Sequence, residues 1–327
     1  MHTGETHKRR HSLYQACNGP DLLARLESLG IDLAAEVGRY VAGECPFAIL
    51  AAGSIAEGTA NAASDLDLLV LVPSQRQLKR AQAAVHLESG HSAEVLLYRE
   101  GVELNIDFMA RDRLDGVVEA FLAIAPVLYD AREVKRIPLI QPTDLQFLHR
   151  LRSGWVLKGE DIVQLWRDEF IVELLPLYLT VRYFYLGIEM LEDAVAVEAG
   201  PTGAVPYMAR QAVESGLLSI LATTGCCSQS HKWLLHWSER ALTTLDPTAR
   251  SVLHTGRQLL FPGELELPAE RQDYLDAVRR FYGHVCAVIE RDIAVRKAIQ
   301  YITAKIGYVG LDAPACGGAA PAALEER

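Results

Sequence analysis

The sequence lacks the features that mark several large classes of protein. Its six cysteines contain no Cys-x-x-Cys pair, no secretory leader is present, and no apolar run reaches membrane-spanning length. We therefore expect a cytoplasmic protein with reduced thiols and no membrane partner. The sequence also contains neither a Gly-x-Gly-x-x-Gly motif nor a Gly-Lys-Ser/Thr motif, which argues against a Rossmann dinucleotide site and against a P-loop.

The sequence also has fewer basic than acidic residues. The chain carries 32 Lys and Arg residues against 42 Asp and Glu residues, so its formal net charge is -10. Because wide nucleic-acid surfaces are usually basic, this balance argues against a nucleic-acid partner. Half of the 327 residues are apolar, which is enough for two ordinary domains, each with a core of its own.

The distribution of residue types divides the chain into four parts. Residues 1–18 are mostly polar and predict a flexible arm, and residues 310–327 are rich in Ala, Gly and Pro and predict a disordered tail. Residues 19–140 mix helical and strand patterns. After Pro138 and Pro142 the apolar periodicity is helical almost throughout, so residues 141–309 predict an all-α bundle of about six helices.

The stretch over residues 47–73 is the most informative part of the sequence. An apolar run ends at Gly53-Ser54, and a second run, ending at Val72, opens with Ser64, Asp65 and Asp67. Strand side chains alternate between the two faces of a sheet, so both carboxylates are predicted to project from one face. Two like charges at the start of a hydrophobic strand repel each other and resist desolvation, so their position favours a bound cation.

A second acidic strand follows. Residues 93–98 and 102–110 predict a β-hairpin with Gly101 in its turn. Glu103, Asn105 and Asp107 share one face of its second strand, where a plain core strand would carry apolar residues. A third carboxylate on a neighbouring strand would complete a metal site begun by Asp65 and Asp67. We predict that this carboxylate is Asp107, with Glu103 as the alternative.

These residues together resemble the motif of the polymerase-β-like nucleotidyltransferase superfamily, in which a Gly-Ser turn is followed by an Asp-x-Asp strand and a third acidic position. The resemblance implies an α+β fold in which a nucleotidyltransferase domain with a small mixed β-sheet precedes the helical bundle. It also implies Mg²⁺ at the carboxylates and transfer of a nucleoside monophosphate from a nucleoside triphosphate with release of pyrophosphate. The two-domain layout is similar to that of the antibiotic nucleotidyltransferases of the aminoglycoside type.

The residues take definite roles under this interpretation. Asp65, Asp67 and Asp107 would hold two Mg²⁺ ions at the α-phosphate, and Asp107 would lower the pKa of the acceptor hydroxyl or accept its proton. Gly53 and Ser54 end a strand and begin a helix, so their backbone N–H groups would cradle the β- and γ-phosphates. Ser64 would cap or orient the loop that carries Asp65.

The triphosphate also needs a protein cation for the charge that metals do not cover. Lys232 is the leading candidate, because Trp233 and Trp237 on the same helix suggest that this end of the helix faces a packed cleft. Lys158 and Arg152 are the alternatives.

The leading hypothesis is therefore a nucleotidyltransferase that moves a nucleoside monophosphate, AMP from ATP by default, to a hydroxyl of a small-molecule acceptor. One alternative is nucleotidylation of a protein or a tRNA, of which the tRNA version is weakened by the acidic net charge. Another is a catalytically silent nucleotide-binding regulator of the same fold, which the three intact aspartates oppose.

Overall fold

The computed structural model describes residues 16–43, 45–61, 64–78, 92–113, 116–117, 119, 140–197, 204–228, 231–263, 265, 268–296 and 298–299. Residues 1–15 of the predicted arm and the predicted tail over residues 310–327 lie outside these ranges. The residue pattern also predicts helices over residues 74–87 and 116–129, and most of both lies outside these ranges.

The chain divides into two compact units. The first comprises Met1–Ile124 and Pro138–Leu175, and the second comprises Ala125–Ile137 and Pro176–Arg327. The domain boundary predicted at residue 141 does not coincide with this division. Residues 138–175 group with the first unit because they contain strand β5 (Trp155–Lys158), which hydrogen-bonds to β1 (Ala48–Ala51). This strand lies in a segment whose periodicity predicts helices.

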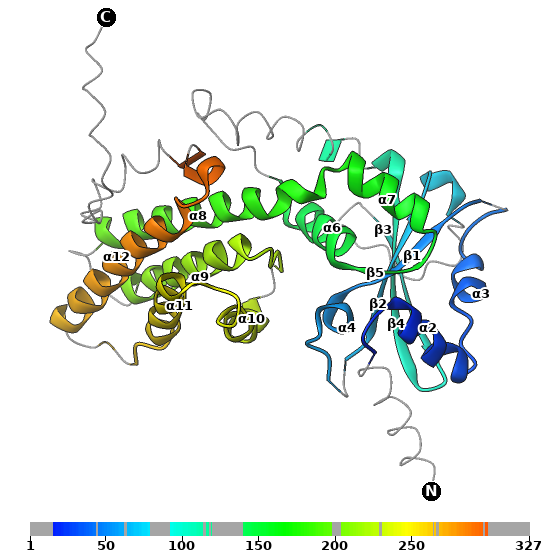
Figure 1. Cartoon of the computed structure of the whole chain (residues 1–327), viewed down its shortest axis with the longest axis horizontal. Helices are drawn as coiled ribbons and strands as arrows, with labels where there is room; N and C mark the ends of the chain where they lie inside the picture. The colour runs from blue at the N-terminus through cyan, green and yellow to red at the C-terminus, as the bar shows by residue number, and fades with distance from the viewer. Residues whose placement is uncertain are drawn as a thin grey trace, which may run out of the picture. The chain divides into compact units, whose positions relative to one another are not determined.

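The first unit is built on a five-stranded mixed sheet with the order β3-β4-β2-β1-β5 (Figure 1). Its central strand β2 (Leu66–Val72) pairs antiparallel with β1 and parallel with β4 (Val102–Ala110). Strand β3 (Ser92–Arg99) pairs antiparallel with β4. The prediction of a small mixed sheet is therefore confirmed, and so is the hairpin, whose turn places Glu100 and Gly101 at φ 48° and 81°.

The two faces of β2 have different partners. Leu66, Leu68 and Val70 belong to a buried core that also contains side chains from α2 (Gly19–Ser28) and α3 (Leu33–Gly38). Alternation along the strand turns Asp67, Leu69 and Leu71 to the opposite face. That face meets α6 (Pro142–Ser153), because Arg150 of this helix forms an ion pair with Asp67. The remaining α-helices described in this unit are α4 (Gly53–Glu57) and α7 (Glu160–Glu169).

The described part of the second unit is helical, as predicted. Its α-helices are α8 (Leu175–Ala196), α9 (Ala204–Thr223), α10 (Leu234–Ala241), α11 (Pro247–Leu259) and α12 (Pro268–Ile289). Tyr282 of α12 shows how closely three of these helices pack: its hydroxyl donates to the carbonyl of Ala212 on α9 at 2.8 Å, and its ring lies 5.9 Å from that of Phe184 on α8.

One stretch within the described residues, Val172–Ala196, is long and apolar enough to cross a membrane by length and composition alone. The prediction that no run reaches this length is therefore wrong. Within the protein, 61% of its apolar window is buried, as in the core helix of a folded domain, so the stretch is weak evidence for a membrane span.

Candidate active site

The candidate site centres on Asp67, the second residue of β2. Leu66 and Leu68 on either side of it are fully buried, so the backbone around the carboxylate is held by the core. Parallel pairing sets Asp67 beside Asn105 and sets Leu69 beside Asp107 on β4. Asp67 and Asp107 therefore face the same side of the sheet on adjacent strands. Asp65 lies just before β2 rather than within it.

Gly53 approaches Asp67 from the end of β1. The backbone N–H of Ala52 donates to the carbonyl of Asp67 at 2.9 Å, which carries the pairing of β1 and β2 up to the turn. Gly53 follows with φ 61°, and a Cβ at this position would overlap the Asp67 carboxylate, lying 2.8 Å from its Cγ. A glycine is thus required here for two reasons: the left-handed backbone and the space that the carboxylate occupies.

Arg150 of α6 joins the two aspartates. Its Nη1 donates to Oδ2 of Asp107, and its Nη2 lies 3.7 Å from Oδ1 of Asp67. The three side chains are 15%, 25% and 17% exposed, so this cluster is largely shielded from water. An ion pair between partly desolvated groups is stronger than one on an open surface, because less water screens it.

A second contact fixes α6 in place. Nε2 of His149 lies 2.7 Å from Oε1 of Glu57, the last residue of α4, and both side chains are about one-tenth exposed. Glu57 lies four residues after Gly53, so this contact ties the helix that carries Arg150 to the helix that follows the Gly-Ser turn. Neither His149 nor Glu57 has a role in the site predicted from the sequence.

Burial raises the pKa of Asp67 from 3.8 to about 6. The positive charge of Arg150 opposes this rise, whereas the negative charges of Asp65, Asp107 and Glu57 add to it. Asp67 is therefore surrounded by more negative charge than a single guanidinium neutralises. A carboxylate in this position is stabilised in its charged form by any further cation that reaches it.

The donor set is suited to a hard divalent cation. Asp67 and Asp107 offer carboxylate oxygens, and Oδ1 of Asn105 is buried with no hydrogen-bond partner in the described structure. The amide nitrogen of the same Asn105 lies 3.4 Å from Oδ1 of Asp67. Oxygen ligands of this kind are those that Mg²⁺ prefers. Within the described residues, no three His, Cys, Asp or Glu side chains are gathered as a ready metal site, so the three-aspartate ligand set stays a prediction.

The remaining residues of the predicted site have local roles in the structure. The carbonyl of Ser54 on α4 accepts the backbone N–H of Thr59 at 2.8 Å. Oγ of Ser64, the residue before Asp65, accepts the backbone N–H of Asn61 at 3.0 Å. Glu103, the alternative third carboxylate, accepts the hydroxyl of Tyr98 on β3 at 2.5 Å. Glu103 is thus engaged across the hairpin, whereas Asp107 contacts Arg150.

The cation that pairs with Asp67 and Asp107 is Arg150, which is not among the three considered from the sequence. Lys232 lies in the 3₁₀-helix His231–Trp233 of the second unit, 5.4 Å from the ring centroid of Trp233. Nζ of Lys158 lies 4.0 Å from the ring centroid of Phe47, and Arg152 pairs with Glu173 at 3.9 Å. Arg150 is only two residues from Arg152, and the sequence gives no sign of which of them faces the sheet.

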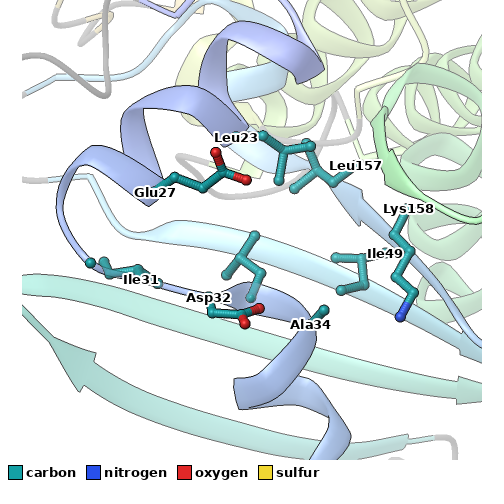
Figure 2. Close-up of a pocket in the computed structure, with 10 residues that line it drawn as sticks. Leu23, Glu27, Ile31, Asp32, Ala34, Ile49, Leu157 and Lys158 are labelled. Carbon is teal, nitrogen blue, oxygen red and sulfur yellow. The ribbon is translucent and has the colours of Figure 1, made fainter.

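A separate hollow of about 500 Å³ lies on the other face of the sheet, beside α2, α3 and strands β1 and β5 (Figure 2). Ile49 lines it and belongs to the core under these two helices, whereas Asp67 projects from the opposite face. Two carboxylates, those of Glu27 and Asp32, and the amine of Lys158 also line it. None of the predicted catalytic aspartates is among its lining residues.

Part of the sequence matches a known family of domains. Residues 42–122 match the family model of the nucleotidyltransferase domain. The matched segment contains Gly53, Asp67 and Asp107, and it ends before Arg150. This part of the chain is therefore a nucleotidyltransferase domain of the polymerase-β-like superfamily, as the Gly-Ser turn and the Asp-x-Asp strand predict.

Other comparisons add little to this assignment. No curated protein matches the sequence. Among solved structures, the chain is similar to a nucleotidyltransferase-like protein from Exiguobacterium sibiricum, with 10% sequence identity and a TM-score of 0.39. The match covers 85% of this chain and 87% of that one.

Proposed function

We propose that this protein transfers a nucleoside monophosphate from a nucleoside triphosphate to a hydroxyl group of a small-molecule acceptor. ATP is the proposed donor, and pyrophosphate is the second product. The observation that carries the proposal is the meeting of Asp67 and Asp107 on adjacent strands, within a segment that matches the nucleotidyltransferase domain. The close approach of Gly53 to Asp67 supports it further.

In the proposed reaction, the phosphorus–oxygen bonds that form and break belong to the substrates rather than to the protein. The acceptor oxygen attacks the α-phosphorus, a new P–O bond forms, and the bond from that phosphorus to the bridging oxygen of the β-phosphate breaks. The electron pair of the broken bond leaves with pyrophosphate. In our proposal the hydroxyl proton passes to the Asp107 carboxylate and from there to solvent.

The carboxylates of Asp65, Asp67 and Asp107 are the residues that would hold Mg²⁺. Bound there, the metal would supply positive charge for the α-phosphate and for the leaving pyrophosphate. The chain itself contributes the shielding of this cluster from water, which strengthens every charge interaction within it. The backbone N–H groups at Gly53 and Ser54 are proposed to bind the outer phosphates.

We assign recognition of the acceptor to the helical part of the chain. The matched domain ends at residue 122, so the residues that follow are free to differ between enzymes that share its chemistry. Lys232 stays our candidate for a phosphate-binding cation from that part.

The test is pyrophosphate release from each of the four nucleoside triphosphates in the presence of Mg²⁺ and a panel of hydroxyl-bearing small molecules. We expect release with ATP and one acceptor class, and an acceptor product heavier by one AMP in mass spectrometry. Asp67→Asn should abolish release. Asp161→Asn, which changes an exposed aspartate on α7, should leave it unchanged and serves as the matched control.

Two results would overturn the proposal in different ways. Nucleotide binding without pyrophosphate release under every acceptor would favour a silent nucleotide-binding regulator. Release that occurs only with a protein or a tRNA as acceptor would retain the chemistry and replace the small-molecule substrate.

A further inference from the structure

Arg150 occupies the place where a cation of the reaction is expected. Its guanidinium contacts Asp107 directly and lies 3.7 Å from Asp67, the two carboxylates assigned above to metal binding. A carboxylate oxygen that accepts a hydrogen bond from a guanidinium offers less electron density and less space to a metal ion. Arg150 and a divalent cation therefore compete for the same oxygens.

We propose that Arg150 is an internal counter-ion that holds Asp67 and Asp107 when no divalent cation is present and is displaced when one binds. The displaced guanidinium then binds the phosphates that enter with the metal. An arginine suits both states, because its planar group with five N–H donors pairs equally well with carboxylate and with phosphate oxygens. This inference rests on the proposed function, since it takes the two aspartates as ligands of the cation.

The backbone of α6 is held firmly enough that only the Arg150 side chain needs to move. Arg167 on α7 donates from Nε to the carbonyl of Leu151 at 2.9 Å and from Nη2 to that of Gly154 at 3.0 Å. A Cβ on Gly154 would lie 2.6 Å from the carbonyl oxygen of Arg150 and 3.0 Å from that of Ala51 on β1, so the end of α6 is closely seated on the sheet. His149 ties the same turn to Glu57.

The charge balance around the cluster favours an exchange of cations over a permanent ion pair. Asp65, Asp107 and Glu57 all add negative charge near Asp67, and one guanidinium supplies a single positive charge. A divalent cation supplies two positive charges at shorter range. Oδ1 of Asn105 is buried and has no partner within the described residues, so it is available as a further oxygen ligand when the guanidinium leaves.

A purely structural ion pair predicts the opposite behaviour on mutation. If Arg150 only held the two strands and α6 together, its removal would disorder the aspartates, and divalent cations would bind more weakly or equally well. If Arg150 competes with the cation, its removal strengthens cation binding in the absence of nucleotide. The change in divalent-cation affinity on removal of Arg150 therefore distinguishes a structural ion pair from a competing counter-ion.

The experiment measures Mn²⁺ binding to the full chain by electron paramagnetic resonance, without nucleotide, in the wild-type protein and in Arg150→Met. We expect the dissociation constant for Mn²⁺ to fall about tenfold in Arg150→Met, which corresponds to about 1.4 kcal/mol. Arg25→Met is the matched control, because it removes the same charge from an ion pair on α2 and should leave Mn²⁺ binding unchanged.

Thermal unfolding gives a second readout that does not depend on turnover. Without metal, Arg150→Met should unfold at a lower temperature than wild type, because two partly buried carboxylates lose their counter-ion. Saturating Mn²⁺ should raise the unfolding temperature more in Arg150→Met than in wild type. With Mn²⁺ present, the variant should bind a non-hydrolysable ATP analogue about tenfold more weakly, because the phosphates lose one charged hydrogen-bond donor.

Further variants keep the outcomes distinct. If Arg150→Met does not fold, Arg150→Lys replaces it, because a lysine retains the charge but loses the planar fork, and Mn²⁺ should bind it more tightly than wild type. Equal or weaker Mn²⁺ binding in the Arg150 variant overturns the inference, provided that Asp67→Asn loses Mn²⁺ in a parallel titration. If Asp67→Asn binds Mn²⁺ as tightly as wild type, the metal site of the proposed function is wrong and the inference fails with it.

Discussion

Gly53 and Asp67 are so close that no side chain fits between them: a Cβ on Gly53 would lie 2.8 Å from Cγ of Asp67 and 3.1 Å from its Cβ. The two residues come from different elements, the start of α4 and the second position of β2. Their contact explains why the turn and the acidic strand belong to one motif. It also places the backbone that follows β1 directly beside the Asp67 carboxylate.

This contact predicts a specific effect of Gly53→Ala. The methyl group forces Asp67 to move, and the left-handed backbone adds about 1 kcal/mol of strain. We expect nucleotidyl transfer to fall about 100-fold, because a displaced reacting group costs far more rate than stability. Steady-state rates of pyrophosphate release and urea unfolding together measure the two effects.

The control for this substitution is Gly38→Ala. Gly38 ends α3, and a Cβ there has no atom within 4 Å. We expect wild-type activity and stability unchanged or raised by less than about 1 kcal/mol. Equal activity in both glycine variants would show that the position of Asp67 is unimportant for the reaction.

The raised pKa of Asp67 predicts how stability depends on pH. Its pKa rises from 3.8 in an ordinary aspartate to about 6 in the folded protein, so the folded state binds this proton more tightly than the unfolded state. Each pKa unit corresponds to 1.36 kcal/mol, so the shift is equivalent to about 3 kcal/mol. The contribution of Asp67 to the free energy of unfolding therefore falls as the pH rises from about 4 to about 6.

Chemical unfolding of wild type and Asp67→Asn between pH 4 and pH 7, with a chelator present, measures this effect. The stability of wild type relative to the variant should decrease by up to about 3 kcal/mol across the range, and should be level above pH 7. A constant difference at every pH would mean that Asp67 titrates in the folded protein as it does in the unfolded chain.

The contact between His149 and Glu57 predicts a loss of stability in His149→Ala. The substitution removes a 2.7 Å hydrogen bond to a carboxylate that is about one-tenth exposed. We expect the free energy of unfolding to fall by about 2 to 4 kcal/mol, because a buried charged acceptor loses a donor. Guanidinium unfolding followed by circular dichroism measures it.

Two further histidine variants test the cause of that loss. His254→Ala changes an exposed histidine on α11 and should alter stability by no more than about 0.5 kcal/mol. His149→Gln offers an amide donor to Glu57 and should recover part of the lost stability. A His149→Ala protein as stable as wild type would show that α6 is held without this contact.

The choice between Asp107 and Glu103 as third carboxylate leads to opposite expectations for two isosteric variants. Asp107→Asn removes a negative charge beside Arg150 and should lower turnover by more than about 100-fold. Glu103→Gln changes a side chain that contacts Tyr98 across the hairpin and should change turnover by less than about threefold. The assignment is reversed if Glu103→Gln is inactive and Asp107→Asn is active.

Much of the sheet could be predicted from residue order. An apolar run that ends before Gly53 marks β1, a second run that begins after Asp65 marks β2, and the Gly101 turn marks the β3–β4 hairpin. These elements follow from short-range rules, the alternation of side chains and the backbone freedom of glycine. Strand β5 was not predicted, because its four residues form a strand only through pairing with β1, more than 100 positions earlier in the chain.

The parallel pairing of β2 with β4 places Asp67 and Asp107 on one side of the sheet. The sequence by itself determined only that Asp107 shares a strand face with Glu103 and Asn105 and that a glycine turn precedes Asp67, because alternation and turn geometry act between near neighbours. It did not determine which cation meets those aspartates. Arg150 and Arg152 are both arginines in the last turn of α6, and they differ only in the direction in which their side chains leave the helix. That direction depends on how α6 is seated by His149, Arg167 and Gly154, and these are contacts between residues far apart in the chain. Only the tertiary structure therefore decides which arginine faces the aspartates.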